Sequence, residues 1–425
     1  MKKKKAPLVR RMKEFVKTSV VWGPLDHNLF FTIIFLNVYG IIMVYSASYN
    51  NSITKNYSYF MNNQLKNVIF GFVIMIVASY VNYHRIVRFG WGWFWLLAAV
   101  AIIAALKTPL AHSELGATRW IKLGPVSFQA AEPIKAAIII FFAYYVSYWG
   151  LNRWYNQLLA CLLAIALLGF LFFFSNNLST VIVLFCICAV IILSSVKKPD
   201  LYWYFLIGLA LIIIAAIGVT VYLLMHQGAE NFRFVRIRAW LHPEEYAADE
   251  GLQAMQARYA IGAGGFWGKG LGQSLIKFKL SYSYNDFILA IICEELGVFG
   301  VIVMMTLFGY LLYRIYKIAQ NAWDIEGKVL AIGVFTQIAL QLLINVMVVT
   351  SVIPTTGVTL PFFSAGGTSV VFLLAELGMV LNVDKYAKER RFFEEAERHV
   401  AQMEQRGGIG AAGWRRRLDS ARTRR

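Results

Sequence analysis

The sequence predicts an all-α protein, a polytopic membrane bundle of about ten transmembrane helices with a large extracytoplasmic loop between the seventh and eighth spans. Hydrophobic residues make up 59% of the 425 residues and charged residues only 15%, with a mean hydropathy of +0.58. A soluble domain carries about a quarter charged residues. Apolar runs of roughly 20 residues, long enough to cross a bilayer, recur along the chain between short basic segments.

The apolar runs define the candidate spans in chain order. The first run is too long for a signal peptide and has no small-residue cleavage site after it, so we expect it to be retained as a span. Spans five and six are divided only by Ser175, Asn176 and Asn177, which suffice for a tight turn. The candidate spans are 28–48, 66–82, 90–107, 131–149, 156–175, 178–195, 201–225, 286–313, 328–352 and 366–383.

The basic residues orient these spans. Lys and Arg are enriched in cytoplasmic loops, and alternate connections of this chain carry them. Both termini are then cytoplasmic, with a basic N-terminus at 1–27, a transmembrane domain at 28–384 and a charged tail at 385–425. The net charge of +18 has this explanation, so we predict no nucleic-acid partner. The orienting residues are the N-terminal lysines, Arg85, Arg88, Arg153, Lys197, Lys198, Arg314, Lys317 and the basic tail.

The opposite face receives the connections 49–65, 108–130, 226–285 and 353–365, which are rich in Gly, Pro, aromatic and polar residues. Connections are usually a few residues long, and much longer ones are typically functional or disordered. The aromatic residues and glycines of 226–285 argue against disorder. The sequence therefore predicts that the chemistry is extracytoplasmic.

The first polar segment runs from Gly116 to Lys135. Arg119 and Lys122 flank an interfacial Trp and can reach an anionic head group. Glu132 and Lys135 have i, i+3 spacing on one helix face and can pair. Two interpretations stay open for that pair: simple mutual neutralisation, or a functional role, because ionisable groups at membrane depth are costly.

The second segment, 258–274, has six glycines within residues 262–272. Such a loop permits close backbone approach and could wrap an anionic ligand beside Lys269. A turn with only a packing role is the alternative. The pattern is not a nucleotide-binding fingerprint.

The third segment centres on Asp286, where the large loop enters span eight. A carboxylate at that boundary is partly desolvated, which raises its pKa toward that of a useful base. The alternative is a plain helix cap formed by Asn285 or Asp286. Glu294 and Glu295 lie roughly 12 Å further along the helix and project in other directions, so we expect them to be interior residues that need partners.

The fourth segment, 354–369, contains two prolines and three glycines within an apolar pattern. Interrupted backbone at membrane depth is tolerated only where it is buried in protein or lines a cavity. The segment is therefore predicted to be the wall of an outward-facing cavity.

No metal site or disulfide is predicted from the pattern. The six His are scattered, and neither CxxC nor HExxH occurs. The cysteines all lie in apolar runs, where Cys behaves as a small hydrophobe. They are Cys161, Cys186, Cys188 and Cys293.

These four segments, in this order, resemble the SEDS family (shape, elongation, division and sporulation), which includes the peptidoglycan polymerases FtsW and RodA. The resemblance extends over about residues 27 to 384. The stretches 236–243 and 177–180 are more similar to the FtsW-type division branch of Gram-positive bacteria than to RodA.

At three places the chain departs from the family pattern. Ser281-Tyr282 stands where many members have Pro-Glu, and Ala365 stands where they have Tyr. Before Glu132, Ala130-Ala131 stands where they have Pro-Ser. The missing Glu puts a second carboxylate or a metal ligand at position 282 in doubt and leaves Asp286 untouched.

The resemblance implies a glycosyltransferase that polymerises lipid II on the outer face of the bacterial cytoplasmic membrane, at the division septum. It implies a class B penicillin-binding protein transpeptidase as partner, together with other divisome membrane proteins and membrane lipid. Asp286 matches the family's essential aspartate and would be the catalytic base. Candidate substrate-binding residues are Arg119, Lys122, Lys135, Glu132 and Lys269. A cofactor is left open between none and a divalent Mg²⁺ or Mn²⁺ ion.

Other functions compete with the polymerase. A lipid II flippase would also need a cavity with cations and broken helices. The RodA-type elongation enzyme or the sporulation paralogue would share the motifs, and a scaffold for the division machinery would not need Asp286. A secondary transporter is disfavoured because no inverted repeat is evident.

Overall fold

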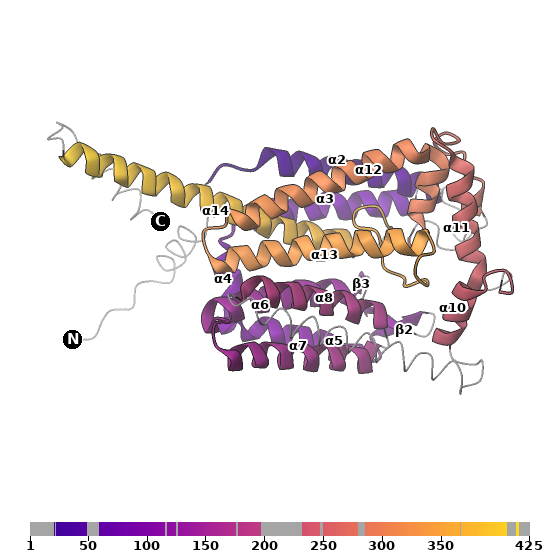
Figure 1. The fold of residues 1–425 in the computed structure, drawn as a ribbon, viewed down its shortest axis with the longest axis horizontal. Coiled ribbons are helices and arrows are strands. Elements are labelled where there is room, and N and C mark those ends of the chain that lie inside the picture. The colour runs from indigo at the N-terminus through magenta and orange to yellow at the C-terminus, as the bar shows by residue number, and fades with distance from the viewer. Residues whose placement is uncertain are drawn as a thin grey trace.

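The computed structural model describes residues 21, 23–48, 59–114, 117–124, 126–175, 177–196, 232–246, 250–278, 285–365, 367–405 and 414–415. These residues form a bundle of long helices lying side by side, with two shorter helices across one end (Figure 1). The predicted span 201–225, Lys197, Lys198, Tyr282, most of the basic N-terminus and the end of the tail lie outside the described residues.

Every predicted span within the described residues coincides with a helix. The turn predicted after Ser175 is confirmed, because one helix ends there and the next begins at Leu178. The long helices are α2 (His27–Ser48), α3 (Tyr59–Tyr80), α5 (Trp93–Ala105), α6 (Ala131–Trp149), α7 (Trp154–Ser175), α8 (Leu178–Ser195), α12 (Ile288–Gln320), α13 (Ile325–Val349) and α14 (Thr368–Gln405).

The outer surface of the bundle is apolar. Among the described helices, α2, α3, α7, α8, α12 and α13 are long and apolar enough to cross a membrane, and α5 is a shorter apolar helix. Large side chains such as Phe35, Leu97 and Leu162 point outward and are more than half exposed. An apolar surface of this extent belongs in lipid. The chain is therefore a multi-pass membrane protein.

One end of the bundle, called here the Asp286 end, carries the additional structure. The predicted loop 226–285 contains α10 (Phe232–Leu241), α11 (Glu250–Gly264) and the 3₁₀ turn η2 (Ile276–Phe278), and α10 and α11 run across the helix ends (Figure 1). The connection 108–130 adds a small antiparallel sheet to the predicted helices, in the order β1 (Ala111–Glu114), β2 (Ala117–Leu123), β3 (Val126–Gln129).

The other end, called here the Arg88 end, holds α4 (Tyr83–Val87), the 3₁₀ turn η1 (Phe89–Gly92) and the turn between α12 and α13. Arg88 contacts Glu326 on α13, and Arg314 on α12 pairs with Asp26. The basic residues Arg85, Arg88 and Arg314 thus share one end, as the charge pattern predicts. Helix α14 runs unbroken past residue 384 and projects from this end (Figure 1).

Helix α12 contains a kink at Gly297, where φ is 64° and ψ is −164°. The kinked backbone pairs with the glycine-rich segment: Lys269 N–H donates to Glu294 O at 2.9 Å, and Val298 N–H donates to Gly265 O at 3.1 Å. A Cβ on Gly297 would lie 2.4 Å from Gly268 N. The glycines of the second and third sequence segments therefore let two backbones touch.

Candidate functional site

Asp286 lies in the turn that precedes α12, and its backbone is fixed from two sides. The side-chain amide of Asn345 on α13 donates to Asp286 O at 3.0 Å. The Ser364 hydroxyl donates to Asn285 O at 2.8 Å. The cap position of α12 is Phe287, and no side chain caps it. The helix-cap alternative for Asn285 or Asp286 is therefore wrong.

Two arginines set the electrostatics of Asp286. The carboxylate is half-buried, and burial raises its pKa above the ordinary value. The positive charges of Arg119 on β2 and Arg236 on α10 act in the opposite direction. Burial makes a carboxylate in this setting a stronger proton acceptor than an exposed one, while the two arginines still stabilise its anionic form.

A β-bulge and a glycine position Arg119. The register between β1 and β2 shifts after His112. His112 pairs with Trp120, but Ser113 pairs with Thr118, which leaves Arg119 as the extra residue. Bulges of this kind re-aim a side chain. The guanidinium lies against Gly357, where a Cβ would be 2.6 Å from Nη1. Gly357 has φ of +71°, so both its backbone and its neighbour disfavour any side chain.

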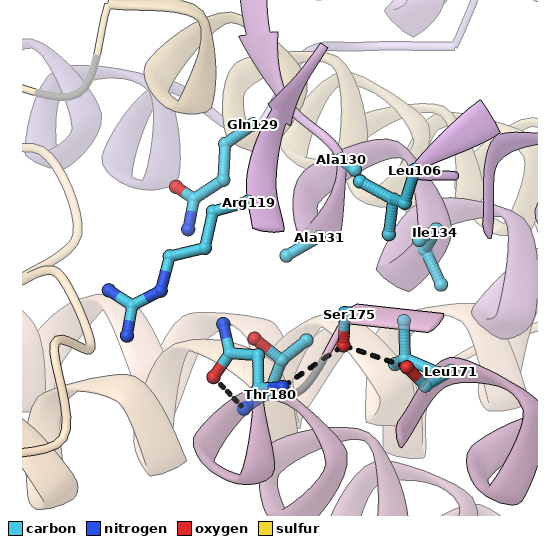
Figure 2. Close-up of a pocket in the computed structure, with 10 residues that line it drawn as sticks. Leu106, Arg119, Gln129, Ala130, Ala131, Ile134, Leu171, Ser175 and Thr180 are labelled. Carbon is cyan, nitrogen blue, oxygen red and sulfur yellow. Dashed lines mark hydrogen bonds between the residues drawn. The ribbon is translucent and has the colours of Figure 1, made fainter. Parts of the chain in front are cut away.

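Two adjoining cavities open beside this arginine. The smaller one is lined by Arg119, Gln129 and Ser175 among others, and Figure 2 shows Arg119 and Gln129 reaching into it from the sheet. The larger one shares Gln129 with the smaller and is also lined by Lys135 and Gly357. Segments one and four thus form walls of one cavity system, and this outcome supports the predicted cavity wall.

The Glu132–Lys135 pair is formed. Lys135 Nζ lies 2.9 Å from both carboxylate oxygens of Glu132, and both side chains are buried. The two residues also line the larger cavity. The pair therefore neutralises itself and, at the same time, presents a cation and an anion to a ligand in that space. Asn345 links this cavity to Asp286, because its amide also donates to Val358 O at 3.0 Å.

Lys269 lies in a different network. Its Nζ is 2.8 Å from Glu294 Oε1, and its side chain is 34% exposed. The Glu294 carboxylate also accepts hydrogen bonds from the Ser274 hydroxyl and from the backbone N–H of Leu275 and Ile276. These contacts favour the packing alternative for the glycine-rich segment. Lys269 holds this segment to α12 and does not join the group around Asp286.

Glu295 is an interior residue, whereas Lys122 lies on the surface. Glu295 is fully buried and accepts hydrogen bonds from the Ser46 hydroxyl, and Lys277 Nζ lies 3.6 Å away. Glu294 and Glu295 are therefore interior residues with partners, as predicted. Lys122 is exposed on β2 and lines neither cavity.

Two residues of the site were not predicted. Arg236 belongs to a stretch that carried the family resemblance, but its place beside Asp286 depends on α10 crossing the bundle end. Asn345 is a polar residue in an apolar span, and such a residue at membrane depth is a signal of function. Neither could be assigned a partner from spacing, because Asn345 lies 59 residues from Asp286.

Within the described residues, the group that could hold a metal ion lies at the Arg88 end and consists of His84, Asp324 and Glu326. No such group of His, Cys, Asp or Glu side chains includes Asp286, again among the described residues.

Comparisons with known proteins agree with this architecture. Residues 26–389 match the model of the FtsW/RodA/SpoVE family, described as cell cycle protein. The probable peptidoglycan glycosyltransferase FtsW of Bacillus subtilis is 32% identical over 85% of this chain and 91% of its own length. The corresponding protein of Trichlorobacter lovleyi is 33% identical over 88% of this chain and 96% of its own length. Stage V sporulation protein E of Bacillus subtilis is 33% identical over 84% of this chain and 96% of its own length.

Solved structures share the fold. A chain from a peptidoglycan synthase complex superposes with a TM-score of 0.71 at 22% identity, over 86% of this chain and 99% of that one. The rod shape determining protein RodA of Thermus thermophilus gives a TM-score of 0.61 at 22% identity, over 85% and 97%.

Proposed function

The chain belongs to the FtsW/RodA/SpoVE family of cell cycle proteins, and from that premise we propose that it is a peptidoglycan glycosyltransferase that polymerises lipid II during cell division. The relatives that carry this activity in their names match it over most of their length. The polymerisation takes place on the outer face of the cytoplasmic membrane, so the Asp286 end faces outward and the basic Arg88 end faces the cytoplasm.

Asp286 is the general base in this proposal. Its carboxylate takes the proton from the 4-hydroxyl of the acceptor sugar as that oxygen bonds to the anomeric carbon of the donor. The bond from this carbon to the lipid diphosphate breaks, and the diphosphate leaves with the bonding electrons. General-base assistance is worth about 10²–10⁴-fold in rate. The observation that carries the proposal is a half-buried carboxylate with its backbone fixed and two arginines beside it.

The leaving diphosphate needs positive charge where its own charge develops. Arg119 is the first candidate, because it acts electrostatically on Asp286 and lines the smaller cavity. Lys135 lines the adjoining cavity, and its pairing with Glu132 keeps it in place. Arg236 is a further candidate, because its positive charge also acts on Asp286. Lys122 and Lys269 have weaker claims, since one is exposed outside the cavities and the other is held by Glu294.

The proposed partner is a class B penicillin-binding protein transpeptidase. The peptidoglycan synthase complex with the same fold is described as coordinating polymerization and crosslinking, and a polymerase needs such a crosslinking partner. Association with other divisome membrane proteins at the septum belongs to the same proposal.

Polymerisation of purified lipid II by the protein with its partner, followed by gel analysis of glycan strands, tests the function. We expect Asp286→Asn to fold and bind its partner but to lose about 10²–10⁴-fold in rate. Unchanged synthesis in the variant would remove Asp286 from the mechanism. Movement of lipid II across vesicles without polymer would favour a flippase. Parallel reactions with and without EDTA, Mg²⁺ or Mn²⁺ decide whether a divalent cation takes part.

The sporulation branch is a specific second candidate, because stage V sporulation protein E is as similar in identity as the FtsW relatives. Complementation separates the two. Expression of the chain should restore septation to cells depleted of their division polymerase. Rescue of spore cortex formation alone would assign the chain to the sporulation branch.

A further inference from the structure

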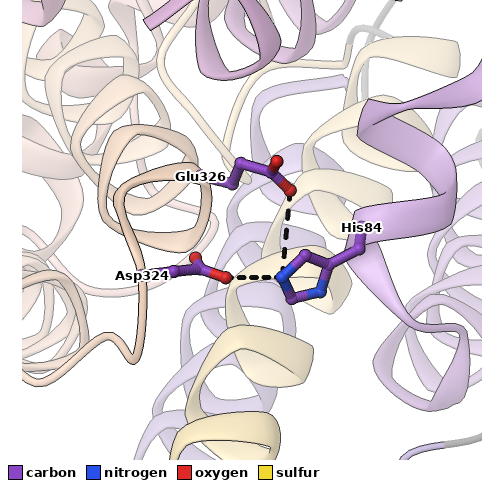
Figure 3. Close-up of side chains that lie close together, drawn as sticks. All are labelled: His84, Asp324 and Glu326. Atoms are coloured by element: carbon purple, nitrogen blue, oxygen red, sulfur yellow. Dashed lines mark hydrogen bonds and ion pairs between the residues drawn. The ribbon is translucent and has the colours of Figure 1, made fainter. Parts of the chain in front are cut away.

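At the Arg88 end, three side chains from distant parts of the chain converge on one point. His84 comes from α4, Asp324 precedes α13, and Glu326 lies in the first turn of α13 (Figure 3). His84 Nε2 is 2.5 Å from Asp324 Oδ2 and 3.8 Å from Glu326 Oε2. One ligand atom of each residue lies within 4.8 Å of the others. This group is separate from the proposed glycosyltransferase site.

The imidazole of His84 is oriented by Asn82. Asn82 Oδ1 accepts the backbone N–H of His84 at 3.0 Å, which identifies it as the oxygen, and it lies 2.8 Å from His84 Nδ1. Nδ1 therefore carries the hydrogen and donates it to Asn82. The Tyr83 ring stacks on the imidazole with centroids 4.1 Å apart. His84 thus presents Nε2 to the two carboxylates, as a metal-binding histidine does when its other nitrogen is held by an oxygen acceptor.

The two carboxylates are held in the same manner. Oδ1 of Asp324 accepts the Gly327 N–H at 2.8 Å and the Tyr83 hydroxyl at 2.9 Å. Oxygen Oδ2 is left to face His84.

Glu326 shows the same division between its two oxygens. Oε1 accepts from Arg88 Nε at 2.9 Å and from the Ser147 hydroxyl at 3.0 Å. Oε2 has no hydrogen-bond partner among the described residues, although the Glu326 side chain is only 3% exposed. A buried carboxylate oxygen without a partner is costly, and here it is directed toward His84 and Asp324. This buried, unpartnered oxygen is an observation, independent of the clustering, that points to ligand binding by the three residues.

We propose that His84 Nε2, Asp324 Oδ2 and Glu326 Oε2 bind one divalent transition-metal ion of the Zn²⁺ or Mn²⁺ class. One imidazole and two carboxylates suit such ions, with metal–ligand bonds of about 2.0–2.2 Å for Zn²⁺. Ligand atoms in a tetrahedral Zn²⁺ site stand about 3.3 Å apart, so the ion would sit between Nε2 and Oδ2 after a small opening of that contact.

The bound ion would tie α4 to the start of α13. Helix α13 is the same helix that holds Asp286 O through Asn345 near its other end. The expected effect is therefore stabilisation of the bundle by a cross-link between segments 240 residues apart.

Metal content and thermal stability test the site. The protein, purified in detergent with an affinity tag that contains no histidine, is stripped with chelator, incubated with Zn²⁺ or Mn²⁺ and desalted. We expect one tightly bound Zn²⁺ per chain by mass spectrometry of metals, an increase in Tm, and a low-symmetry Mn²⁺ spectrum by electron paramagnetic resonance. His84→Gln and Glu326→Gln should each weaken binding at least about 10-fold.

The control is His399→Gln, which removes an exposed histidine of α14 and should keep the metal. Asp324→Asn retains Oδ1 as acceptor for Gly327 N–H, so it should fold and still lose the metal. Wild-type protein that returns from desalting without metal, or variants that bind as wild type does, would show that the cluster is only an ion pair. This readout does not depend on glycan synthesis, so its failure would leave the proposed enzyme activity unaffected.

Discussion

Asn345, inside the apolar helix α13, donates one side-chain amide to the carbonyl oxygens of both Asp286 and Val358, each at 3.0 Å. The residue is fully buried. It joins the turn that carries the proposed base to the segment that lines the larger cavity. The position of the carboxylate therefore depends on a residue that has no part in proton transfer.

Asn345→Leu should reduce kcat for lipid II polymerisation by about 10–100-fold, because loss of both hydrogen bonds releases the Asp286 turn and small misplacements are costly to catalysis. The KM for lipid II should change little. Thr336→Val on the same helix is the control, since the Thr336 hydroxyl donates a hydrogen bond to Ile332 O within the helix. An Asn345→Leu enzyme with full kcat would show that the hydrogen bonds do not position Asp286.

Arg119→Gln should move the acid limb of the pH–rate profile to higher pH. The base must be deprotonated to work, and the Arg119 charge lowers the pKa of Asp286 against the effect of burial. Removing that charge raises the pKa, so activity is lost at a higher pH as the medium is acidified. Arg119→Lys should retain the wild-type limb. Lys107→Gln, an exposed cation before β1, is the control, and an equal shift in this variant would contradict a specific role for Arg119.

Gly297→Ala should destabilise the protein by about 3 kcal/mol, because the left-handed φ and the neighbouring backbone both exclude a Cβ. Gly309→Ala lies on the same helix in open space and should be neutral or up to about 1 kcal/mol more stable. Thermal unfolding in detergent, followed by tryptophan fluorescence, measures both. Equal Tm values for the two variants would refute the proposed interlocking of the kink with the glycine-rich segment.

Lys269→Gln should lower Tm and leave the KM for lipid II unchanged, because Lys269 is bound to Glu294. A double-mutant cycle with Glu294→Gln should give a coupling energy of about 0.5–3 kcal/mol, toward the lower end because Lys269 retains access to water. Lys328→Gln, an exposed cation on α13, is the control. A raised KM with an unchanged Tm would return Lys269 to the substrate site.

Much of the fold could be predicted from local patterns. The apolar runs located the helices, because each helix in lipid must satisfy its own backbone and bury a long apolar face. The i, i+3 spacing of Glu132 and Lys135 predicted their pair correctly. The interior positions of Glu294 and Glu295 were also correct, but their partners were not identified, because the glycine-rich segment meets α12 through backbone contacts that no spacing rule describes.

The amino-acid pattern was sufficient to predict a multi-pass helical membrane protein, to place the orienting basic residues of alternate connections at one end, and to single out Asp286 as the carboxylate to test first. Which cations act on Asp286 became clear from the three-dimensional packing alone. A β-bulge positions Arg119, and Arg236 lies on a helix that crosses the bundle end; the charges of both act on Asp286. Hydrophobic periodicity indicates, for each residue, whether its side chain faces lipid or the core. The partners of a polar group are set by how distant segments pack, and that information lies in no single stretch of the chain.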